Sequence, residues 1–564
     1  MDTTTIIEYI FGGSNPYFRV LLLFSGILLY TIVLRRVLKI PFMIGGIIAI
    51  FISMVLPLTI AFPIALCVWM LSGILKILIK PSEKVKPKSI SLKTEDSFDF
   101  VVDGKPVNLT NPYRGIYVQG GAGSGKSASL VYPILKQALI KNYAGICYDF
   151  KSPELASFLF QQAQKSKIAP YLVDFKNPKR SIRVNPLDPN FMHKTAYASE
   201  HAQTLMYNLS PSNIKKEDYW MMEAKSVLTG LIWYLKKNHP RYCSLPHVIS
   251  LLLHANIPLL IEKISEDFEA AGFVASLKQA IKNESTRQVS GVMSTLQTNL
   301  SKLNTPDIFW ILSGNDISLD INDPTDPKFL CIGNESTLSQ TYAPVVSLII
   351  SVALKMMNQP EKHKSVVLID ELPTLYINKL EQTPATARSN KIATVLACQD
   401  FSQLVDRYGR EKAQVILSNM GNQFFGRTVN KESAEMIGRL FGKTDKVFRT
   451  TSKGDNYYQS SIWGKHVNSS NSTTGESVQE RDRVKTTDIM NLDPGEFYGI
   501  IAEGSHTEIL KSKFSMNPHG DDMPFAFHNT TTIEEITENY VNIIENSLGL
   551  LNLKHNETHD LIGF

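Results

Sequence analysis

Two long apolar, uncharged stretches stand near the N-terminus, at residues 20–34 and 40–75. A helix rises about 1.5 Å per residue, so the 36 residues of the second stretch exceed what a hydrocarbon layer of about 30 Å requires. Pro57 and Pro63 near its middle predict a turn between two short spans. We therefore expect a transmembrane anchor over residues 1–80, with three crossings or, as the alternative, two.

Beyond the anchor, short β-rich runs alternate with amphipathic segments, a rhythm that is typical of a parallel sheet covered by helices. This rhythm is interrupted between residues 194 and 303 by a long stretch of helix formers with little strand character. The pattern predicts an α/β fold with an inserted all-α domain. The expected strands lie at 113–119, 145–150, 329–333, 365–370, 392–399, 423–427 and 497–502.

Two polar segments stand apart from this rhythm. Residues 450–475 are rich in Ser, Thr, Asn and Gly, which predicts an exposed loop. The tail 516–564 carries eight acidic residues and one Lys, with apolar residues at helical spacing between Ile533 and Ile544. A helix there either docks a basic partner with its acidic face or packs on its own domain.

The net charge of the chain is +5, but residues 1–90 hold nine Lys or Arg against three Asp or Glu. The remainder has a net charge of −1 (+5 less +6), so any nucleic-acid surface there must come from local arrangement. The five cysteines lie far apart and have no metal-ligand spacing. A reducing compartment is expected, without a disulfide framework or a zinc site.

A glycine-rich loop follows an apolar run and precedes a helical pattern, which is the strand, loop and helix context of a phosphate-binding loop. Its backbone N–H groups would converge on phosphate oxygens, the lysine would reach the β- and γ-phosphates, and the serine after it would ligate Mg²⁺. The loop residues are Gly120, Gly121, Ala122, Gly123, Ser124, Gly125, Lys126, Ser127 and Ala128.

A second motif consists of four apolar residues, 366–369, that lead into Asp370 and Glu371. Such a run predicts a buried parallel strand whose end delivers Asp370 to Mg²⁺ and Glu371 to the attacking water. Gln399 ends the next apolar run and is the candidate sensor of the γ-phosphate. These motifs predict an ATPase that binds ATP and Mg²⁺.

Arg388 lies in a polar stretch and is the candidate arginine that a neighbouring subunit would supply to the transition state. Arg427 and Arg439 are the alternatives.

In combination these motifs resemble the type IV coupling proteins of conjugation systems, over residues 1–515. Further matches support the resemblance: Pro133 seven residues after Lys126, the segments 149–154 and 183–188, Trp220 with Ala224, and the 11-residue interval from Arg388 to Gln399. The family more often has two spans with a periplasmic segment between them. The expected anchor of this chain departs from that pattern, because its loops are very short.

The resemblance implies a RecA-like P-loop NTPase domain in two parts, 81–193 and 304–515, around the insertion 194–303. It implies a hexamer at the bacterial inner membrane, with the ATPase domain in the cytoplasm. Its partners would be DNA, expected to be single-stranded and bound to a relaxase, together with relaxosome proteins and components of the type IV secretion channel. The alternatives are a nucleotide-gated receptor for protein substrates and an FtsK-like translocase of double-stranded DNA, and the acidic C-terminus disfavours the second.

Overall fold

The computed structural model describes residues 95–458, 467–503, 507–517 and 531–552. The predicted anchor lies outside the described residues, in a separate unit, Met1–Ser89; all that follows concerns the unit Ile90–Phe564. Within the described ranges, one helix, Ser336–Met357, is long and apolar enough to cross a membrane, and 67% of its apolar window is buried inside the protein. That helix belongs to the core described below.

The centre of the protein is a nine-stranded sheet. Its seven strands from β9 to β5 are parallel, whereas β12 runs antiparallel to β9 and β13 runs antiparallel to β12. The expected parallel sheet is therefore mixed at one edge. In order, the strands are β13 (Glu508–Lys513), β12 (Glu496–Ile500), β9 (Asn422–Phe425), β3 (Ile116–Gln119), β8 (Ile392–Cys398), β7 (Ser365–Ile369), β4 (Ala144–Asp149), β6 (Lys328–Gly333) and β5 (Ala169–Asp174).

All seven predicted strands are present, within a few residues of the expected bounds, and the central strands of the sheet are buried on both faces. Side chains alternate between the faces: Val366 and Leu368 of β7 enter one core, and Val367 and Ile369 enter the other. The first core lies under α5 (Tyr132–Ile140), α6 (Glu154–Ala163) and the hairpin of β1 (Phe98–Val102) and β2 (Lys105–Leu109). The second lies under α15 (Ser339–Met357) and α17 (Phe401–Tyr408).

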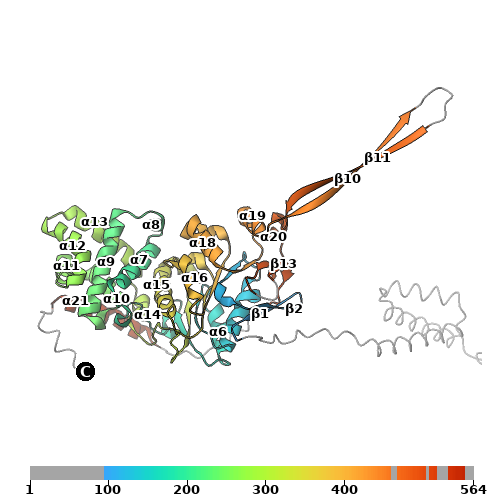
Figure 1. Ribbon diagram of the computed structural model, residues 1–564. Coiled ribbons are helices and arrows are strands. Elements are labelled where there is room, and N and C mark those ends of the chain that lie inside the picture. Colours follow the sequence, from blue (N-terminus) through green and yellow to red (C-terminus); the bar gives the residue numbers. More distant parts are fainter. Residues whose placement is uncertain (1–94, 459–466, 504–506, 518–530, 553–564) are drawn as a thin grey trace, which may run out of the picture. The chain divides into compact units, whose positions relative to one another are not determined.

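Between β5 and β6 the chain forms a helical region, green in Figure 1. The region packs around α9, whose residues Leu228, Leu231 and Ile232 are fully buried, and α7 joins it to the sheet by packing on α15. The predicted α/β fold with an all-α insertion is confirmed. The helices are α7 (Thr195–Leu209), α8 (Ser212–Lys215), α9 (Tyr219–Asn238), α10 (Leu245–His254), α11 (Ile257–Ile264), α12 (Phe268–Lys282), α13 (Thr286–Leu300) and α14 (Pro306–Ser313).

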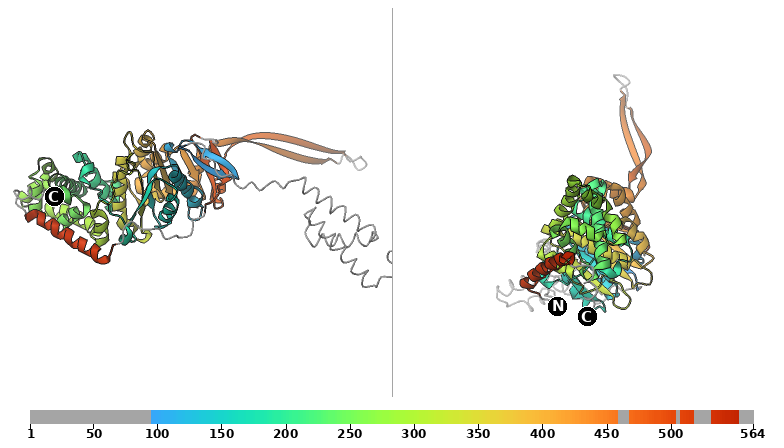
Figure 2. Two further views of the ribbon diagram at one scale, coloured as in Figure 1. Left: turned by 90° about the horizontal axis from the view of Figure 1, so that it is seen from below. Right: turned by 90° about the vertical axis from the view of Figure 1, so that its left-hand side faces the viewer.

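The acidic tail contains the helix α21 (Ile533–Asn552), which lies along the helical region in Figure 2. Ile536 and Ile543 are buried, and the ring of Tyr540 lies 4.8 Å from that of Phe309 in α14. The Tyr540 hydroxyl also donates to Asn304 Oδ1 at 3.1 Å. The apolar face of this helix therefore packs on its own domain, which is the second of the two alternatives, and docking of a basic partner by the acidic face stays a prediction.

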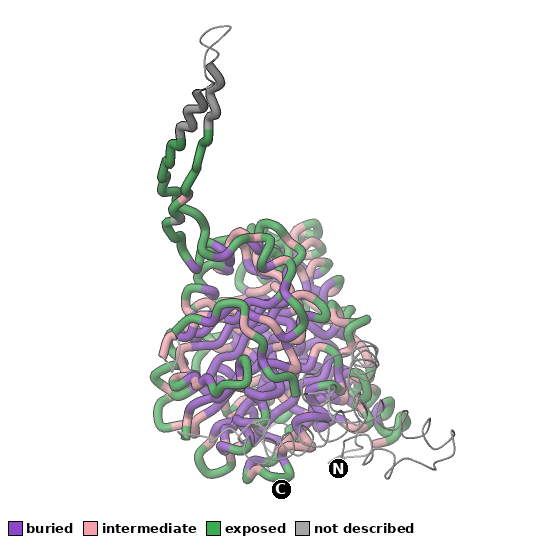
Figure 3. The backbone as a smooth tube through the Cα atoms, turned by 90° about the vertical axis from the view of Figure 1, so that its right-hand side faces the viewer, coloured by how far each residue is buried: buried purple, intermediate pink, exposed green. Residues whose placement is uncertain are grey.

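The expected loop 450–475 is also wrong, because most of it belongs to a two-stranded ribbon. β10 (Lys443–Tyr458) pairs antiparallel with β11 (Val467–Asp482), from Lys443 opposite Asp482 to Tyr458 opposite Val467. Figure 3 shows that the ribbon is exposed where its side chains are described. Neither face is buried, so the sequence lacks the alternation of apolar and polar residues by which strands are predicted.

Candidate nucleotide site

The glycine-rich loop 120–126 joins β3 to a π-helical turn, Ser127–Val131, which continues into α5. It lies at the carboxyl end of β3, between β9 and β8. The Gly121 N–H donates to the carbonyl of Arg427 at 2.8 Å, which fixes the loop to the end of β9. The helix N-terminus and free backbone N–H groups of such a loop attract phosphate oxygens.

Two further residues, which the sequence did not reveal, also support the loop: Gly495 before β12 and Asn517 after β13. The Gly495 N–H donates to Ser124 O at 2.8 Å, and the Asn517 N–H donates to Ala128 O at 2.8 Å. Gly125 has φ +84°, and a Cβ on it would lie 2.8 Å from the Gly495 nitrogen, so only glycine fits there. Contacts between residues some 370 positions apart leave no local pattern by which they could be predicted.

Lys126 points at the carboxylates that follow β7. Its Nζ lies 3.1 Å from Glu371 Oε1 and 3.6 Å from Asp370 Oδ1, and its side chain is almost fully buried. Burial lowers the pKa of Lys126, but the charges of Asp370 and Glu371 outweigh it and hold that pKa above its usual value. The structure thus brings together the lysine and the two acids that the sequence singled out.

Gln399 joins the same cluster from the end of β8, the strand between β3 and β7. Its Nε2 donates to Glu371 Oε1 at 3.2 Å, so one carboxylate oxygen holds both the ammonium and the amide. Because β3, β8 and β7 are parallel neighbours, their carboxyl ends deliver all these side chains to one edge of the sheet.

The chemistry of this edge suits Mg²⁺. Asp370 Oδ1 is buried, and no described residue donates a hydrogen bond to it. The hydroxyl of Ser127 stands at the start of the helix after Lys126. A carboxylate and a hydroxyl, completed by phosphate oxygens and water, form the oxygen donor set that Mg²⁺ prefers. Ser127 and Asp370 are therefore the residues that fit this ion.

Asp149 ends β4, the strand next to β7, and is buried. Its Oδ2 accepts the Ala156 N–H at 3.0 Å, which ties the strand end to α6. Burial, assisted by the charge of Asp370, raises the pKa of Asp149 to about 7. The segment 149–154, one of the matches that support the resemblance, therefore places a third carboxyl, which can hold a proton, beside the site.

The three candidate arginines have exposed or half-exposed side chains. Arg388 precedes β8, at the end opposite Gln399, and the seven residues of that strand, about 23 Å in length, lie between the two in the chain. It is half exposed and lies 3.9 Å from Glu503. Arg439 is exposed on α19 (Lys431–Leu440). Arg427 is also exposed, although its own backbone carbonyl accepts the Gly121 N–H of the phosphate loop. Arg388 is thus not brought into the site of its own chain.

The fold resembles solved structures of the bacterial conjugative coupling protein TrwB. The unbound monoclinic form of TrwBdeltaN70 matches with a TM-score of 0.54 and 17% identity, over 78% of this chain and 92% of that one. TrwB with ADP and Mg²⁺ matches with a TM-score of 0.51 and 16% identity, over 74% of this chain and 87% of that one. TrwB with the non-hydrolysable ATP analogue ADPNP gives 0.52 and 15%, over 74% and 89%.

At these identities the likeness establishes the fold alone. A search of curated protein sequences gave no match. The family model described as type IV secretory system conjugative DNA transfer, in contrast, matches residues 69–506. Because that match spans most of the sequence, including the phosphate loop, both acids and Gln399, this chain belongs to the conjugative DNA transfer family of type IV secretory systems.

Proposed function

We propose that this chain is a membrane-anchored ATPase that couples ATP hydrolysis to the recruitment and transfer of DNA through a type IV secretion channel. The observation that carries the proposal is the contact of Lys126 with Asp370 and Glu371 at neighbouring strand ends. Family membership supports conjugative DNA transfer as the process. The TrwB complexes with ADP and Mg²⁺ and with ADPNP support ATP and Mg²⁺ as ligands.

Binding would use the loop and its lysine. The backbone N–H groups of residues 120–128 would hold the β-phosphate, and Lys126 would exchange its carboxylate partners for the β- and γ-phosphates. Ser127 and Asp370 would hold Mg²⁺, which neutralises phosphate charge when it is bound.

Hydrolysis would use Glu371 and Gln399, which are hydrogen-bonded to each other. Glu371 would orient the attacking water and accept its proton, and Gln399 would hold the Glu371 carboxylate while it senses the γ-phosphate. The 3.2 Å bond between them supports this pairing, because a positioned base acts only if its orientation is fixed.

Arg388 would complete the site of the next subunit in a ring, which we take to be a hexamer. Its half-exposed position at the far end of β8 supports a role in trans, since that end is remote from the phosphate loop of the same chain. An arginine placed at the transition state accelerates phosphoryl transfer by about 10³–10⁵ in related systems.

The apolar stretches within residues 1–80 support an anchor in the bacterial inner membrane, with the ATPase domain in the cytoplasm. The substrate of transfer would be single-stranded DNA bound to a relaxase. Relaxosome proteins would supply this complex, and components of the secretion channel would receive it.

The experiment is DNA-stimulated ATP hydrolysis by the full chain in lipid nanodiscs, with Lys126→Ala as the matched inactive control. We expect hydrolysis that single-stranded DNA stimulates and that Lys126→Ala abolishes. Stimulation by double-stranded DNA alone would favour an FtsK-like translocase. Hydrolysis that responds to a relaxase protein but to no DNA would favour the receptor for protein substrates.

A further inference from the structure

Asn208, near the end of α7, is buried and makes five hydrogen bonds. Its Oδ1 accepts from the backbone N–H of Tyr376 at 2.9 Å, from Ser347 Oγ at 3.1 Å and from Arg407 Nη2 at 2.8 Å. Its Nδ2 donates to Tyr376 O at 2.7 Å and to Thr204 O at 2.9 Å. One side chain of the helical region therefore binds three separate elements of the sheet domain.

Two of these partners lie within eight positions after a residue of the nucleotide site. Tyr376 lies five positions after Glu371, and the turn between them is closed by Thr374, whose N–H and Oγ donate to Glu371 O at 3.1 and 2.7 Å. Arg407 lies on α17, which begins two positions after Gln399. The segment that leaves Glu371 and the helix that leaves Gln399 thus converge on Asn208.

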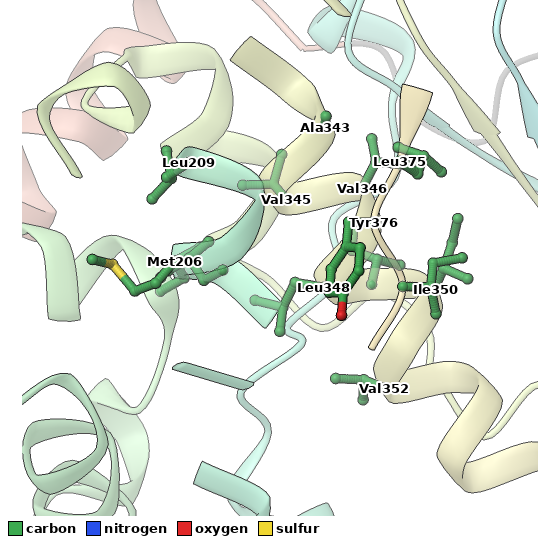
Figure 4. Close-up of a cluster of buried hydrophobic side chains, with 14 of the residues drawn as sticks. Met206, Leu209, Ala343, Val345, Val346, Leu348, Ile350, Val352, Leu375 and Tyr376 are labelled. Carbon is green, nitrogen blue, oxygen red and sulfur yellow. The ribbon is translucent and has the colours of Figure 1, made fainter. Parts of the chain in front are cut away.

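The surroundings of Tyr376 make this junction tight. Its ring lies 5.8 Å from that of Tyr207 on α7 and 5.1 Å from that of Tyr408 on α17, and Lys412 Nζ donates to its hydroxyl at 3.0 Å. Figure 4 shows Leu375 and Tyr376 beside the apolar side chains of α15, with Met206 and Leu209 of α7 on the other side of that helix. Movement of this segment would therefore disturb packed neighbours on several elements.

We propose that Asn208 is a positioning residue for ATP hydrolysis, which holds Glu371 and Gln399 in register with each other and transmits their displacement to α7. This inference rests on the proposed function. Hydrogen bonds in a buried, low-dielectric network are strong, and an unpaired group left there is costly, so the network has one favoured arrangement. A misplacement of a reacting group by about 1 Å lowers a rate by about 10²-fold.

Two substitutions at Asn208 separate hydrogen bonding from packing. Asn208→Leu keeps the volume and loses all five bonds, whereas Asn208→Asp keeps the three accepted bonds and loses the two donated ones. We expect kcat of the full chain in nanodiscs to fall by about 10-fold to 10²-fold in Asn208→Leu, with the KM for ATP changed by less than about 3-fold. Asn208→Asp should recover a large part of that loss.

Asn299 offers the matched control, because it is a buried asparagine of the same helical region. Its described side-chain bonds go to Ser210, Thr295 and Lys302, none of which follows a site residue. Asn299→Ala should destabilise the protein while kcat stays within about 2-fold of wild type. A folded Asn208→Leu protein with wild-type kcat, or an equal loss of kcat in Asn299→Ala, would overturn the inference. Absence of hydrolysis in the wild type would instead remove the proposed function itself.

Hydrogen exchange of α7 gives a second readout, which does not depend on turnover. We expect the exchange rates of the α7 amides to differ between the ADP-bound and ADPNP-bound protein, and this difference to disappear in Arg407→Met. That variant keeps an apolar stem at position 407 and leaves the Asn208 side chain intact. Identical exchange of α7 in both nucleotide states of the wild type would overturn the transmission to the helical region, even if Asn208→Leu did not fold.

Discussion

The ammonium of Lys126 lies 3.1 Å from Oε1 of Glu371, and both side chains are buried. The lysine expected to bind phosphate is thus held by the acid expected to activate water. In the proposed mechanism, a γ-phosphate that enters the site would compete with Glu371 for the lysine, and Glu371 would become available to a water molecule as it loses that partner. We therefore expect binding of substrate and release of the base to be one event.

We expect Glu371→Gln to bind ATP at least as tightly as wild type and to hydrolyse it about 10²-fold more slowly or worse. The neutral amide does not compete with the phosphates for Lys126, so ATP binding is retained. It also cannot accept a proton from the attacking water, so hydrolysis is slow. Nucleotide titration and steady-state turnover measure the two effects separately. Wild-type turnover in Glu371→Gln would remove this residue from the site.

Lys126→Ala should behave in the opposite way and lose binding together with turnover. It removes the ammonium that we expect to meet the phosphates, and it leaves Asp370 and Glu371 as neighbouring, largely buried carboxylates with no described cation beside them. Titration with ADPNP tests this directly, and affinity equal to wild type would contradict the role of the lysine in binding.

Arg388→Ala should abolish most hydrolysis, and mixing it with inactive Lys126→Ala subunits should restore part of the activity. A mixed interface pairs an intact phosphate loop with an intact arginine, which neither variant alone provides. The specific activity of wild type should also rise steeply with protein concentration, since assembly would complete the site. Normal activity in Arg388→Ala would move the role to Arg427 or Arg439, or to no arginine.

The free energy of unfolding should depend on pH through Asp149. Its pKa of about 7 in the folded chain lies above the ordinary 3.8, so between these values the folded chain holds a proton that the unfolded chain has released. Stability therefore falls as pH rises from about 4 to about 7. Asp149→Asn should remove this contribution. Denaturant titrations of wild type and Asp149→Asn in nucleotide-free and magnesium-free buffer should therefore give two curves of unfolding free energy against pH that differ in slope. Parallel curves would contradict it.

The helix α21 should stabilise the helical region through one face only. Ile543→Ala removes buried apolar atoms and should lower the free energy of unfolding by about 2–4 kcal/mol. Val541, on the same helix, is 45% exposed, so Val541→Ala should change it by less than about 0.5 kcal/mol. Chemical denaturation of the two variants decides the point, and equal effects would mean that the helix does not pack in solution as described.

The central sheet and the nucleotide site were predictable because their residues are continuous in the sequence. Each of the runs before Asp370 and Gln399 is buried on both faces and contains no charged residue, and the glycine-rich loop has a fixed spacing. The hairpin of β1 and β2 also carried a signal, an Asp-Gly turn at residues 103–104, which our strand prediction overlooked.

Other features had no local signal. β5 is an edge strand with Pro170 near its start, and its first residues are not buried. The contacts of Gly495 and Asn517 with the phosphate loop, and of Asn208 with Tyr376, join distant parts of the chain. In each case the tertiary structure alone selects the partner, so periodicity and motif spacing do not reveal it.

The two-stranded ribbon leaves and re-enters the protein at one point, where the Arg483 N–H donates to Gly442 O at 3.0 Å. The distance between Gly442 and Arg483 therefore does not depend on how many residue pairs the ribbon contains. Evolution can lengthen, shorten or replace the ribbon without a change of register in β9 or β12. For the experimenter, the same geometry makes this junction a place to graft an affinity tag or a fluorescent reporter.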